Sequence, residues 1–347
     1  MALLVGVLVI VASLLRHDGD IAGLVKFGAD DPANGLTAHA EQVMDRSVAH
    51  SDDLGHDGKF FFIQALDPLY LSPADHAVFL DRPVYRGQRM LFPLVAGFGG
   101  LTPAGFVPWT MALINLAAVA AGTLAASRLA QRYGGSPWLG LAFVANPGVL
   151  FEFDISGAGI VAFAAALWAT LALEEDRDQA AMWWFTAAVL AREVMFLYLA
   201  GVLILRLWRT RRIPFMIGIV PTLAAGAWAA YLRVRLDVGS GVDQVQEFGW
   251  PFGGMVDAWD NWAANPVDLA VIAGLVIVMP MLIVRGIQQP NYSAAGAMGF
   301  VILALLMSRQ VWWRFFDISR AVAPIITAYV LTSFSAPLRK PQDAVSL

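Results

Sequence analysis

The 347-residue chain contains no cysteine. Disulfide bonds, thiolate-bound metals and cysteine nucleophiles are therefore excluded, whatever the redox state of the compartment. Charged residues are also scarce, because they make up 14% of the chain while hydrophobic residues make up 58%. A soluble globular protein needs a larger polar surface than this composition provides. The sequence therefore predicts an integral membrane protein whose solvent is lipid.

Several familiar motifs are missing as well. The chain has no GxxxxGK[ST] nucleotide-binding loop, no HExxH zinc motif and no GxSxG nucleophile motif. Its five histidines all lie between positions 17 and 76, without the spacing of metal ligands on a helix. The net charge of -4 indicates neither a nucleic acid nor an anionic membrane surface as a partner. Any catalysis is therefore expected to use oxygen or nitrogen groups, with no cofactor.

Apolar stretches follow one another through most of the chain. The first, Ala2 to Leu15, has no basic residues before it and no cleavage pattern after it, so we expect a retained helix rather than a signal peptide. The later stretches run over Phe106 to Ser127, Trp138 to Phe151, Gly157 to Leu173, Ala180 to Trp208, Ile213 to Leu232, Val267 to Val284, Ala294 to Met307 and Ile318 to Phe334. Together they predict a single all-α membrane domain over residues 1–347, with about nine to ten transmembrane helices, some of them short.

Arginine placement predicts which loops face the cytoplasm, because Lys and Arg are retained on that side. The short basic loops that follow Arg128 and Arg206 are placed inside. Counting crossings from them puts both termini inside and requires the Ala180 to Trp208 stretch to begin and end on the same side. About 29 residues is too long for one ordinary span and fits two short ones. We therefore expect a hairpin whose tip lies at Arg192 and Glu193, on the outer face.

The same count places a long first loop, residues 16–105, outside the cytoplasm, together with 233–266 and 308–317. Residues 16–89 contain twelve acidic and seven basic residues, a surplus of five negative charges. A segment of this length is too long for a plain connection, so we expect short helices within it, some of them in the membrane interface. One is expected over Arg89 to Leu101. The three outer segments and the hairpin tip are predicted to meet at one membrane face.

The densest polar cluster lies in the first loop. It runs from Ser51 to Lys59, includes Asp52, Asp53, His56 and Asp57, and is followed at once by three phenylalanines. Glycines on both sides of Asp57 and aromatic residues behind it would hold a carboxylate at the membrane surface. A solvated turn before an amphipathic helix is the alternative explanation.

Arginines mark three further clusters. Arg82, Arg86 and Arg89 suit a phosphate, because the planar guanidinium donates paired hydrogen bonds, and snorkelling beside lipid headgroups is the alternative. Arg192 and Glu193 are costly within an apolar stretch, so they indicate either a site or a structural pair. The last cluster consists of Arg309, Gln310, Trp312, Trp313, Arg314, Asp317 and Arg320. Its last three charges recur every three residues and so share a helical face, although an aromatic belt with flanking charges explains the cluster equally well.

Four of these elements resemble motifs of the GT-C glycosyltransferases, multi-pass enzymes that take a sugar from a polyprenyl phosphate on the outer or luminal membrane face. His56-Asp57-Gly58-Lys59-Phe60-Phe61 is similar to the family's aromatic, Asp, Gly, Gln, aromatic, Tyr element, with His56 and Lys59 as departures. The stretch from Asp81 to Leu94 is similar to the Tyr, Arg, Arg and (F/Y)PL stretch of small bacterial members. Ala191-Arg192-Glu193 resembles their (T/A)RE element, and Arg320 to Pro324 resembles the opening of a late helix.

The resemblance implies a hexosyl- or pentosyltransferase whose active site faces the outside of a bacterial plasma membrane. In the implied mechanism, Asp57 is the catalytic base that takes the proton of the acceptor hydroxyl. Arg192, Arg314 or Arg320 binds the departing lipid phosphate, and Glu193 holds Arg192 in position. Supporting roles are expected for Asp52, Asp53, His56, Lys59, Arg86, Arg89 and Asp154. Of these, Asp52, Asp53 and Asp154 are the reserve carboxylates.

The implied donor is a polyprenyl phosphate sugar, and the acceptor is a glycan, a lipid or a protein at a surface rich in membrane lipids. No cofactor is implied, and a divalent metal that bridges two carboxylates stays an open alternative. Two other classes also stay open: a transporter or lipid flippase with a relay of intramembrane charges, and a non-catalytic scaffold subunit. The clustering of charges at one face, rather than at mid-membrane, favours the transferase.

Overall fold

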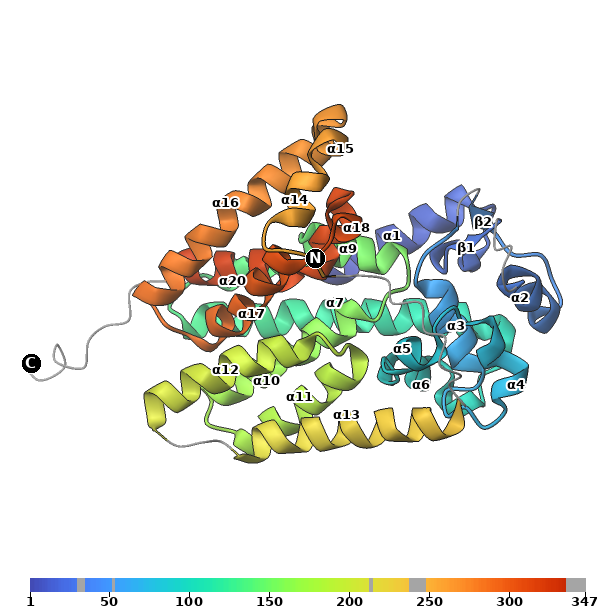
Figure 1. Ribbon diagram of the computed structural model, residues 1–347, viewed down its shortest axis with the longest axis horizontal. Helices are drawn as coiled ribbons and strands as arrows, with labels where there is room; N and C mark the ends of the chain where they lie inside the picture. The colour runs from blue at the N-terminus through green and yellow to red at the C-terminus, as the bar shows by residue number, and fades with distance from the viewer. Residues whose placement is uncertain (30–34, 52–53, 212–214, 237–247, 335–347) are drawn as a thin grey trace, which may run out of the picture.

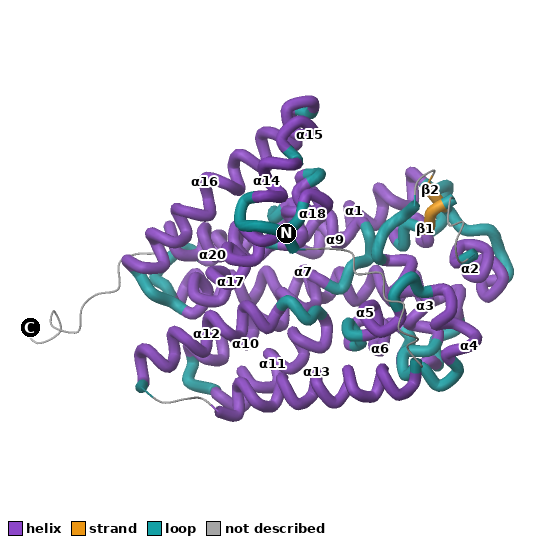
Figure 2. The backbone as a smooth tube through the Cα atoms, viewed as in Figure 1, coloured by secondary structure: helices purple, strands orange, loops and turns teal. Residues whose placement is uncertain are grey.

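The computed structural model describes residues 1–29, 35–51, 54–211, 215–236 and 248–334. Helices make up most of these ranges (Figure 2). The strands within them are two residues long, β1 (Phe27–Gly28) and β2 (His50–Ser51), and they pair in parallel. The predicted all-α class is therefore confirmed.

Nine helices of eleven or more residues form the body of the described structure (Figure 1). They are α1 (Ala2–Arg16), α7 (Val107–Arg132), α10 (Gly159–Glu174), α11 (Asp178–Ala191), α12 (Met195–Thr210), α13 (Phe215–Arg235), α16 (Pro266–Gln288), α17 (Tyr292–Leu306) and α20 (Ala323–Ser333). The long helix α7 lies in the middle of the molecule. The first-loop helices lie toward one of its ends, and the turn between α10 and α11, the end of α12 and the start of α13 lie toward the other.

Three helical segments are each long and apolar enough to cross a membrane: Ala104–Arg132, α13 and α16. A fourth results if α19 (Phe315–Ala321) and α20, which meet at a bend of 67°, form one span. Helices α1, α10 and α17 are apolar but contain only 15 or 16 residues. At 1.5 Å per residue they reach about 22 to 24 Å, less than the roughly 30 Å of a hydrocarbon core. The architecture thus fits an all-α membrane protein with three to four helices of full spanning length.

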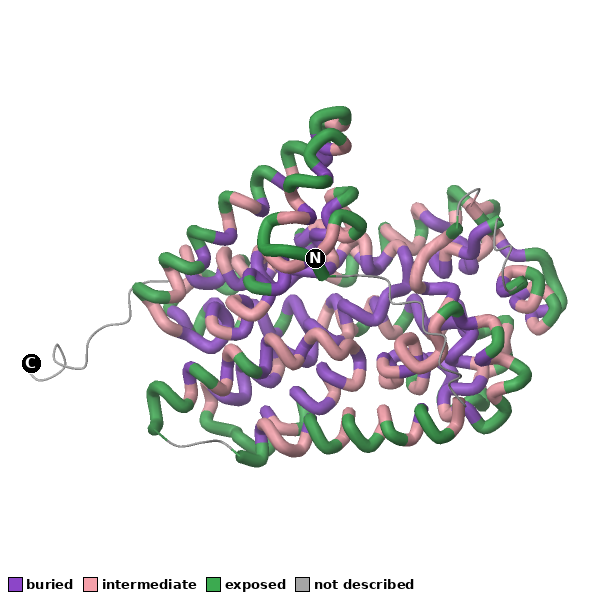
Figure 3. Tube along the Cα trace, in the orientation of Figure 1, coloured by how far each residue is buried: buried purple, intermediate pink, exposed green. Residues whose placement is uncertain are grey.

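The outer helices present apolar side chains to their surroundings. Only 17% of the apolar window of α13 is buried within the molecule, and 28% of that of α16. Figure 3 shows the outer side of α13 as largely exposed, whereas α7 and α10 contain many buried residues. An apolar surface of this extent is unfavourable in water and favourable in lipid.

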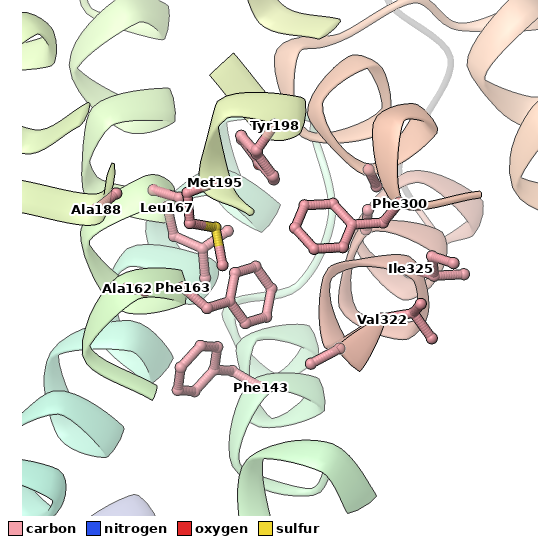
Figure 4. Close-up of a cluster of buried hydrophobic side chains, with 14 of the residues drawn as sticks. Phe143, Ala162, Phe163, Leu167, Ala188, Met195, Tyr198, Phe300, Val322 and Ile325 are labelled. Atoms are coloured by element: carbon pink, nitrogen blue, oxygen red, sulfur yellow. The ribbon is translucent and has the colours of Figure 1, made fainter. Parts of the chain in front are cut away.

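Small residues let the inner helices approach closely. A Cβ on Gly201 of α12 would lie 2.0 Å from the carbonyl oxygen of Ala295 in α17, so these two backbones are in contact. Close approach through small residues is the usual way in which helices pack in lipid. Between the helices, Phe143, Phe163, Met195, Tyr198 and Phe300 fill the centre of the bundle (Figure 4).

The stretch predicted over Trp138 to Phe151 is not one helix. It is divided into η5 (Pro137–Gly140), α8 (Leu141–Val144) and α9 (Pro147–Asp154). Pro147 lacks an N–H and restricts the residue before it, so α8 cannot continue through it. The Asn146 side chain caps α9 by accepting from the N–H of Gly148 at 3.0 Å, and its Nδ2 donates to the carbonyl of Ala323 at 2.8 Å. The break turns α9 toward the end of the bundle where the first loop lies.

The first loop contains the predicted short helices and has a core of its own. They are η1 (Ile21–Leu24), α2 (Leu36–Met44), α3 (Gly58–Leu66), α4 (Pro73–His76), η2 (Ala77–Phe79), α5 (Pro83–Gly87), α6 (Leu91–Ala96), η3 (Phe98–Gly100) and η4 (Ala104–Phe106). Phe62 and Phe92 are fully buried in this core, which also includes Leu232 of α13. The helix expected over Arg89 to Leu101 is shorter than predicted: α6 ends at Ala96, and Phe98 and Gly99 then have positive φ angles of 45° and 69°.

The predicted hairpin is present. Helix α11 ends at Ala191 and α12 begins at Met195. An ion pair of 2.8 Å between Arg206, near the end of α12, and Asp178, at the start of α11, shows that the two helices run antiparallel. The tip, Arg192 and Glu193, therefore lies at the opposite end from the basic turn, as the crossing count requires.

The segments that were predicted to lie outside contact the first loop, as their expected meeting requires. The hairpin tip contacts the first loop through Glu193 and Arg89, and the end of α13 contacts it through Arg235, which donates to the carbonyl of Tyr70 at 2.7 and 2.9 Å. Helices α14 (Gly253–Asp257), α15 (Trp259–Ala264) and α18 (Arg309–Trp312) lie near the start of α16. There the indole of Trp262 donates to the carbonyl of Trp312.

Cysteine substitution tests which end of the bundle faces outward. His50 in the first loop and Thr210 at the end of α12 are both exposed, and the native chain offers no competing thiol. We expect an impermeant maleimide to label His50→Cys in intact cells and Thr210→Cys only after permeabilisation, because basic turns stay in the cytoplasm. The unsubstituted chain is the control, and the reverse labelling pattern would contradict the orientation.

Candidate functional site

Asp57 lies at the start of α3, in a turn that only glycine neighbours permit. A Cβ on Gly58 would lie 2.3 Å from the carbonyl oxygen of Ile155, and one on Gly55 would lie 2.2 Å from that of Lys26. Gly55 also has a φ of 70°, which disfavours any other residue. The two glycines thus let the turn pack directly against two backbone segments, which fixes Asp57 at the centre of the charged cluster.

Three arginines surround the Asp57 carboxylate. Oδ1 accepts from Nη1 of Arg86 at 2.8 Å, and Oδ2 accepts from Nη1 of Arg320 at 2.9 Å. Nη1 of Arg89 lies 3.9 Å from Oδ2. Arg86 belongs to α5, Arg89 follows that helix, and Arg320 belongs to α19. One carboxylate therefore joins the first loop to the last bent helix.

Each of these arginines also contacts a second carboxylate. Arg86 donates from Nε and Nη2 to the two oxygens of Asp81, both at 2.9 Å. Arg89 donates in the same paired way to Glu193, at 3.0 and 2.9 Å. The third contact is looser, with Nε of Arg320 3.7 Å from Asp317. Paired donation from a planar guanidinium holds its plane and direction.

Arg192 pairs with Glu152, at 3.0 Å, and not with Glu193 as the sequence suggested. The expected role of Glu193 in positioning Arg192 is therefore wrong. Arg192 has extended backbone angles, and successive side chains on an extended backbone point to opposite sides, so its neighbour Glu193 is directed toward Arg89. Glu152 is in turn held by the N–H of Gly159, at 3.0 Å from Oε2.

The electrostatic state of Asp57 follows from these contacts. Burial alone would raise the pKa of this carboxyl, but Arg320, Arg86 and Arg89 outweigh burial and hold its pKa well below the usual range. Asp57 is therefore ionised at any physiological pH. A carboxylate with so low a pKa is also a weak base as long as the arginines stay in contact with it.

The space between the charges is closed. The cavity lined by Asp57, Arg89, Glu152 and Arg192 is too small for a water molecule. A neighbouring cavity, lined by Arg192, Arg320 and Glu152 together with apolar residues, has room for about one. A substrate group can enter this site only if side chains move.

Several predicted site residues lie around the cluster with other partners. Arg314 is exposed at the start of α19. It is not one of the arginines that form ion pairs with Asp57, which are Arg86, Arg89 and Arg320. Asp154 pairs with Lys26 at 3.1 Å. The His56 ring lies edge-on to Phe151, with centroids 5.3 Å apart. The predictions for Asp52 and Asp53 fall outside the described residues.

Lys59 lies in the first turn of α3, beside the turn that carries Asp57. Its side chain is buried, and Nζ donates to the carbonyl of Leu54 at 2.7 Å, which ties α3 to the turn before it. This contact supports the turn that carries Asp57.

Sequence reasoning missed two members of the cluster. The sequence assigned no role to Glu152 or to Tyr85, whose hydroxyl accepts from Nη2 of Arg89 at 2.7 Å. The available signal for Glu152 was the crossing count, which places it at the same end as Arg192. Its partner lies 40 residues away and could not be inferred.

Among the described residues, no three His, Asp or Glu side chains are arranged to hold a metal ion. Comparisons with protein families, with curated proteins and with solved structures find no match for this chain. The GT-C resemblance therefore rests on the short sequence motifs alone.

Double-mutant cycles test the pairing. We expect Arg89→Met and Glu193→Gln to show a coupling energy of about 1–3 kcal/mol in the free energy of unfolding, because each single change leaves a buried charge without its partner. Unfolding by SDS in mixed micelles would measure it.

The control cycle combines Arg192→Met with the same Glu193→Gln change. Its coupling should be the smaller, because these two side chains point to different partners. A larger coupling in the control than in the test cycle would contradict the observed arrangement.

Proposed function

We propose that this chain is a membrane glycosyltransferase that moves a sugar from a polyprenyl phosphate to an extracytoplasmic acceptor. The observation that carries the proposal is the buried Asp57 carboxylate among Arg86, Arg89 and Arg320, at one end of a bundle of apolar helices. A base next to clustered guanidinium groups suits the departure of a phosphate from a sugar. Neither of the alternatives, a transporter and a scaffold subunit, requires a carboxylate base beside clustered guanidinium groups.

The proposed reaction is a single displacement that inverts the anomeric carbon. The acceptor O–H bond breaks, its proton goes to the Asp57 carboxylate, and the oxygen forms a bond to the anomeric carbon. The bond between that carbon and the phosphate oxygen breaks, and its electron pair leaves with the lipid phosphate. Phosphate is a weakly basic leaving group, so arginines can stabilise it without a general acid.

In the proposed orientation the charged end faces the outside of the membrane. The nine long helices then count as spans, and with the broken η5–α9 segment they give ten crossings, the even number that two cytoplasmic termini require. The first loop covers the outer end. The basic turn between α12 and α13 faces the cytoplasm, which supports this orientation. An apolar groove between α12 and α13, which includes Phe196 near the hairpin tip and Leu207 near the far end, offers a place for a lipid chain.

A transporter or flippase is the second candidate. Transport by a charge relay needs ionisable groups along the path through the membrane. Here Asp57 and its arginines lie at one end, in elements that also contact the first loop. This placement favours transfer chemistry over transport.

The direct test incubates the purified protein with radiolabelled polyprenyl phosphate sugars and measures release of lipid phosphate. In this assay Asp57→Asn, which keeps size but cannot take a proton, should lower turnover about 10²- to 10⁴-fold. Near-normal turnover in a folded Asp57→Asn protein would move the base to another carboxylate. Absence of lipid phosphate release from every donor, alongside movement of lipid or sugar across vesicles, would favour the transporter.

Arg192 tests the phosphate role separately. Arg192→Lys keeps the charge but loses the guanidinium fork, so we expect a KM for the donor raised about tenfold with a folded protein. The paired change Arg192→Met with Glu152→Gln removes the ion pair without leaving a lone charge and serves as the matched control for stability. Full transferase activity in that double variant would show that Arg192 is structural.

A further inference from the structure

The three guanidinium groups around Asp57 converge on a single carboxylate. Arg86 and Arg320 each donate to a different oxygen, and Arg89 lies within 3.9 Å of one of them. Carboxylate and phosphate are the groups that arginine binds with paired hydrogen bonds. The arrangement has the form of an anion site whose occupant is a side chain of the same protein.

Two of these arginines are held in place without Asp57. Besides its bond to Asp57, Arg86 donates two hydrogen bonds to Asp81, and its guanidinium lies 4.0 Å from the centre of the Phe60 ring. Arg89 donates two hydrogen bonds to Glu193 and one to the hydroxyl of Tyr85. Their guanidinium groups would therefore keep their directions if the Asp57 carboxylate left. The arrangement of these two arginines does not depend on Asp57.

The Asp57 carboxylate leaves no room for a second anion, since the cavity beside it does not hold even a water molecule. The backbone cannot withdraw, because Gly55 and Gly58 are packed against the carbonyls of Lys26 and Ile155. Rotation of the Asp57 side chain about its own bonds is the movement that remains. An anion can thus enter the site by exchange with the carboxylate.

We propose that Arg86, Arg89 and Arg320, beside Arg192, form the phosphate site of this protein, that Asp57 fills it in the unliganded state, and that a lipid phosphate displaces the Asp57 carboxylate. This inference rests on the proposed function. The phosphodiester of a polyprenyl phosphate sugar carries one negative charge, as the carboxylate does, and accepts paired hydrogen bonds, so it can take over the arginine contacts of Asp57.

The exchange also resolves the weak basicity of Asp57. In the unliganded state its charge is stabilised by arginines, which lowers its affinity for a proton. Once a phosphate has taken those contacts, the carboxylate loses its stabilising charges and gains a phosphate anion as a neighbour. Both changes raise its affinity for a proton, so the base becomes active only when the donor is bound.

Binding of dodecyl phosphate to the purified full chain in neutral detergent tests the exchange. Asp57→Asn removes the competing charge, so its Kd for dodecyl phosphate should be at least tenfold lower than that of the native protein. Asp178→Asn removes one carboxylate from an Arg–Asp pair at the other end of the bundle and is the matched control. An unchanged Kd in Asp57→Asn, or an equal gain in both variants, would overturn the proposal.

A measurement on the native protein covers the case in which Asp57→Asn does not fold. Carbodiimide labelling of Asp57, followed by mass spectrometry, should increase when dodecyl phosphate is added and stay constant with dodecyl maltoside. Inorganic phosphate should need a much higher concentration, and equal potency would refute a lipid as the source of the phosphate. Binding of dodecyl phosphate without increased labelling would refute the exchange.

Neither measurement involves sugar transfer. A protein that shows the exchange but releases no lipid phosphate from sugar donors would refute the proposed function alone. An active transferase in which dodecyl phosphate leaves Asp57 unlabelled would refute the exchange alone.

Discussion

The ion pairs of Asp57 join segments that lie far apart along the chain. Its partners Arg86 and Arg320 lie 29 and 263 residues away, in the first loop and in the last bent helix. Charges removed from water are costly unless each has a partner. The contacts of Asp81, Glu193 and Glu152 with the surrounding arginines meet that requirement, so the first loop, the hairpin tip and α9 are all held by one network.

This network explains why the helices are interrupted where they are. Breaks occur at Asn146, before α9, at the hairpin tip and at the 67° bend between α19 and α20. Each break contributes a side chain to the cluster: Glu152 follows the first, Arg192 and Glu193 form the second, and Arg320 lies at the third. Irregular backbone at membrane depth is tolerated where it is buried in protein, and these breaks contact the first loop or one another.

The convergence of arginines on Asp57 suits an anionic group at that position. Four arginines, 86, 89, 192 and 320, lie among five carboxylates, those of Asp57, Asp81, Glu152, Glu193 and Asp317, and Asp57 is the one that three of the arginines approach. A carboxylate in such a place is stabilised as an anion and is a poor proton acceptor. Its use as a base requires that another anion take over its arginines, which ties the chemistry to binding of the donor.

Composition and hydrophobic runs determined the helical class, and the positions of basic residues determined the hairpin at Arg192 and the meeting of the outer segments at one end. Both can be predicted from the order of residues along the chain. A membrane helix is apolar along its length, and the chain must cross the membrane a whole number of times. The partners of the charges were decided by the tertiary structure. Glu193 binds Arg89, 104 residues away, and Arg192 binds Glu152, because side-chain direction depends on backbone angles at the tip and on how α9 and α5 approach it. No spacing along the chain encodes those angles.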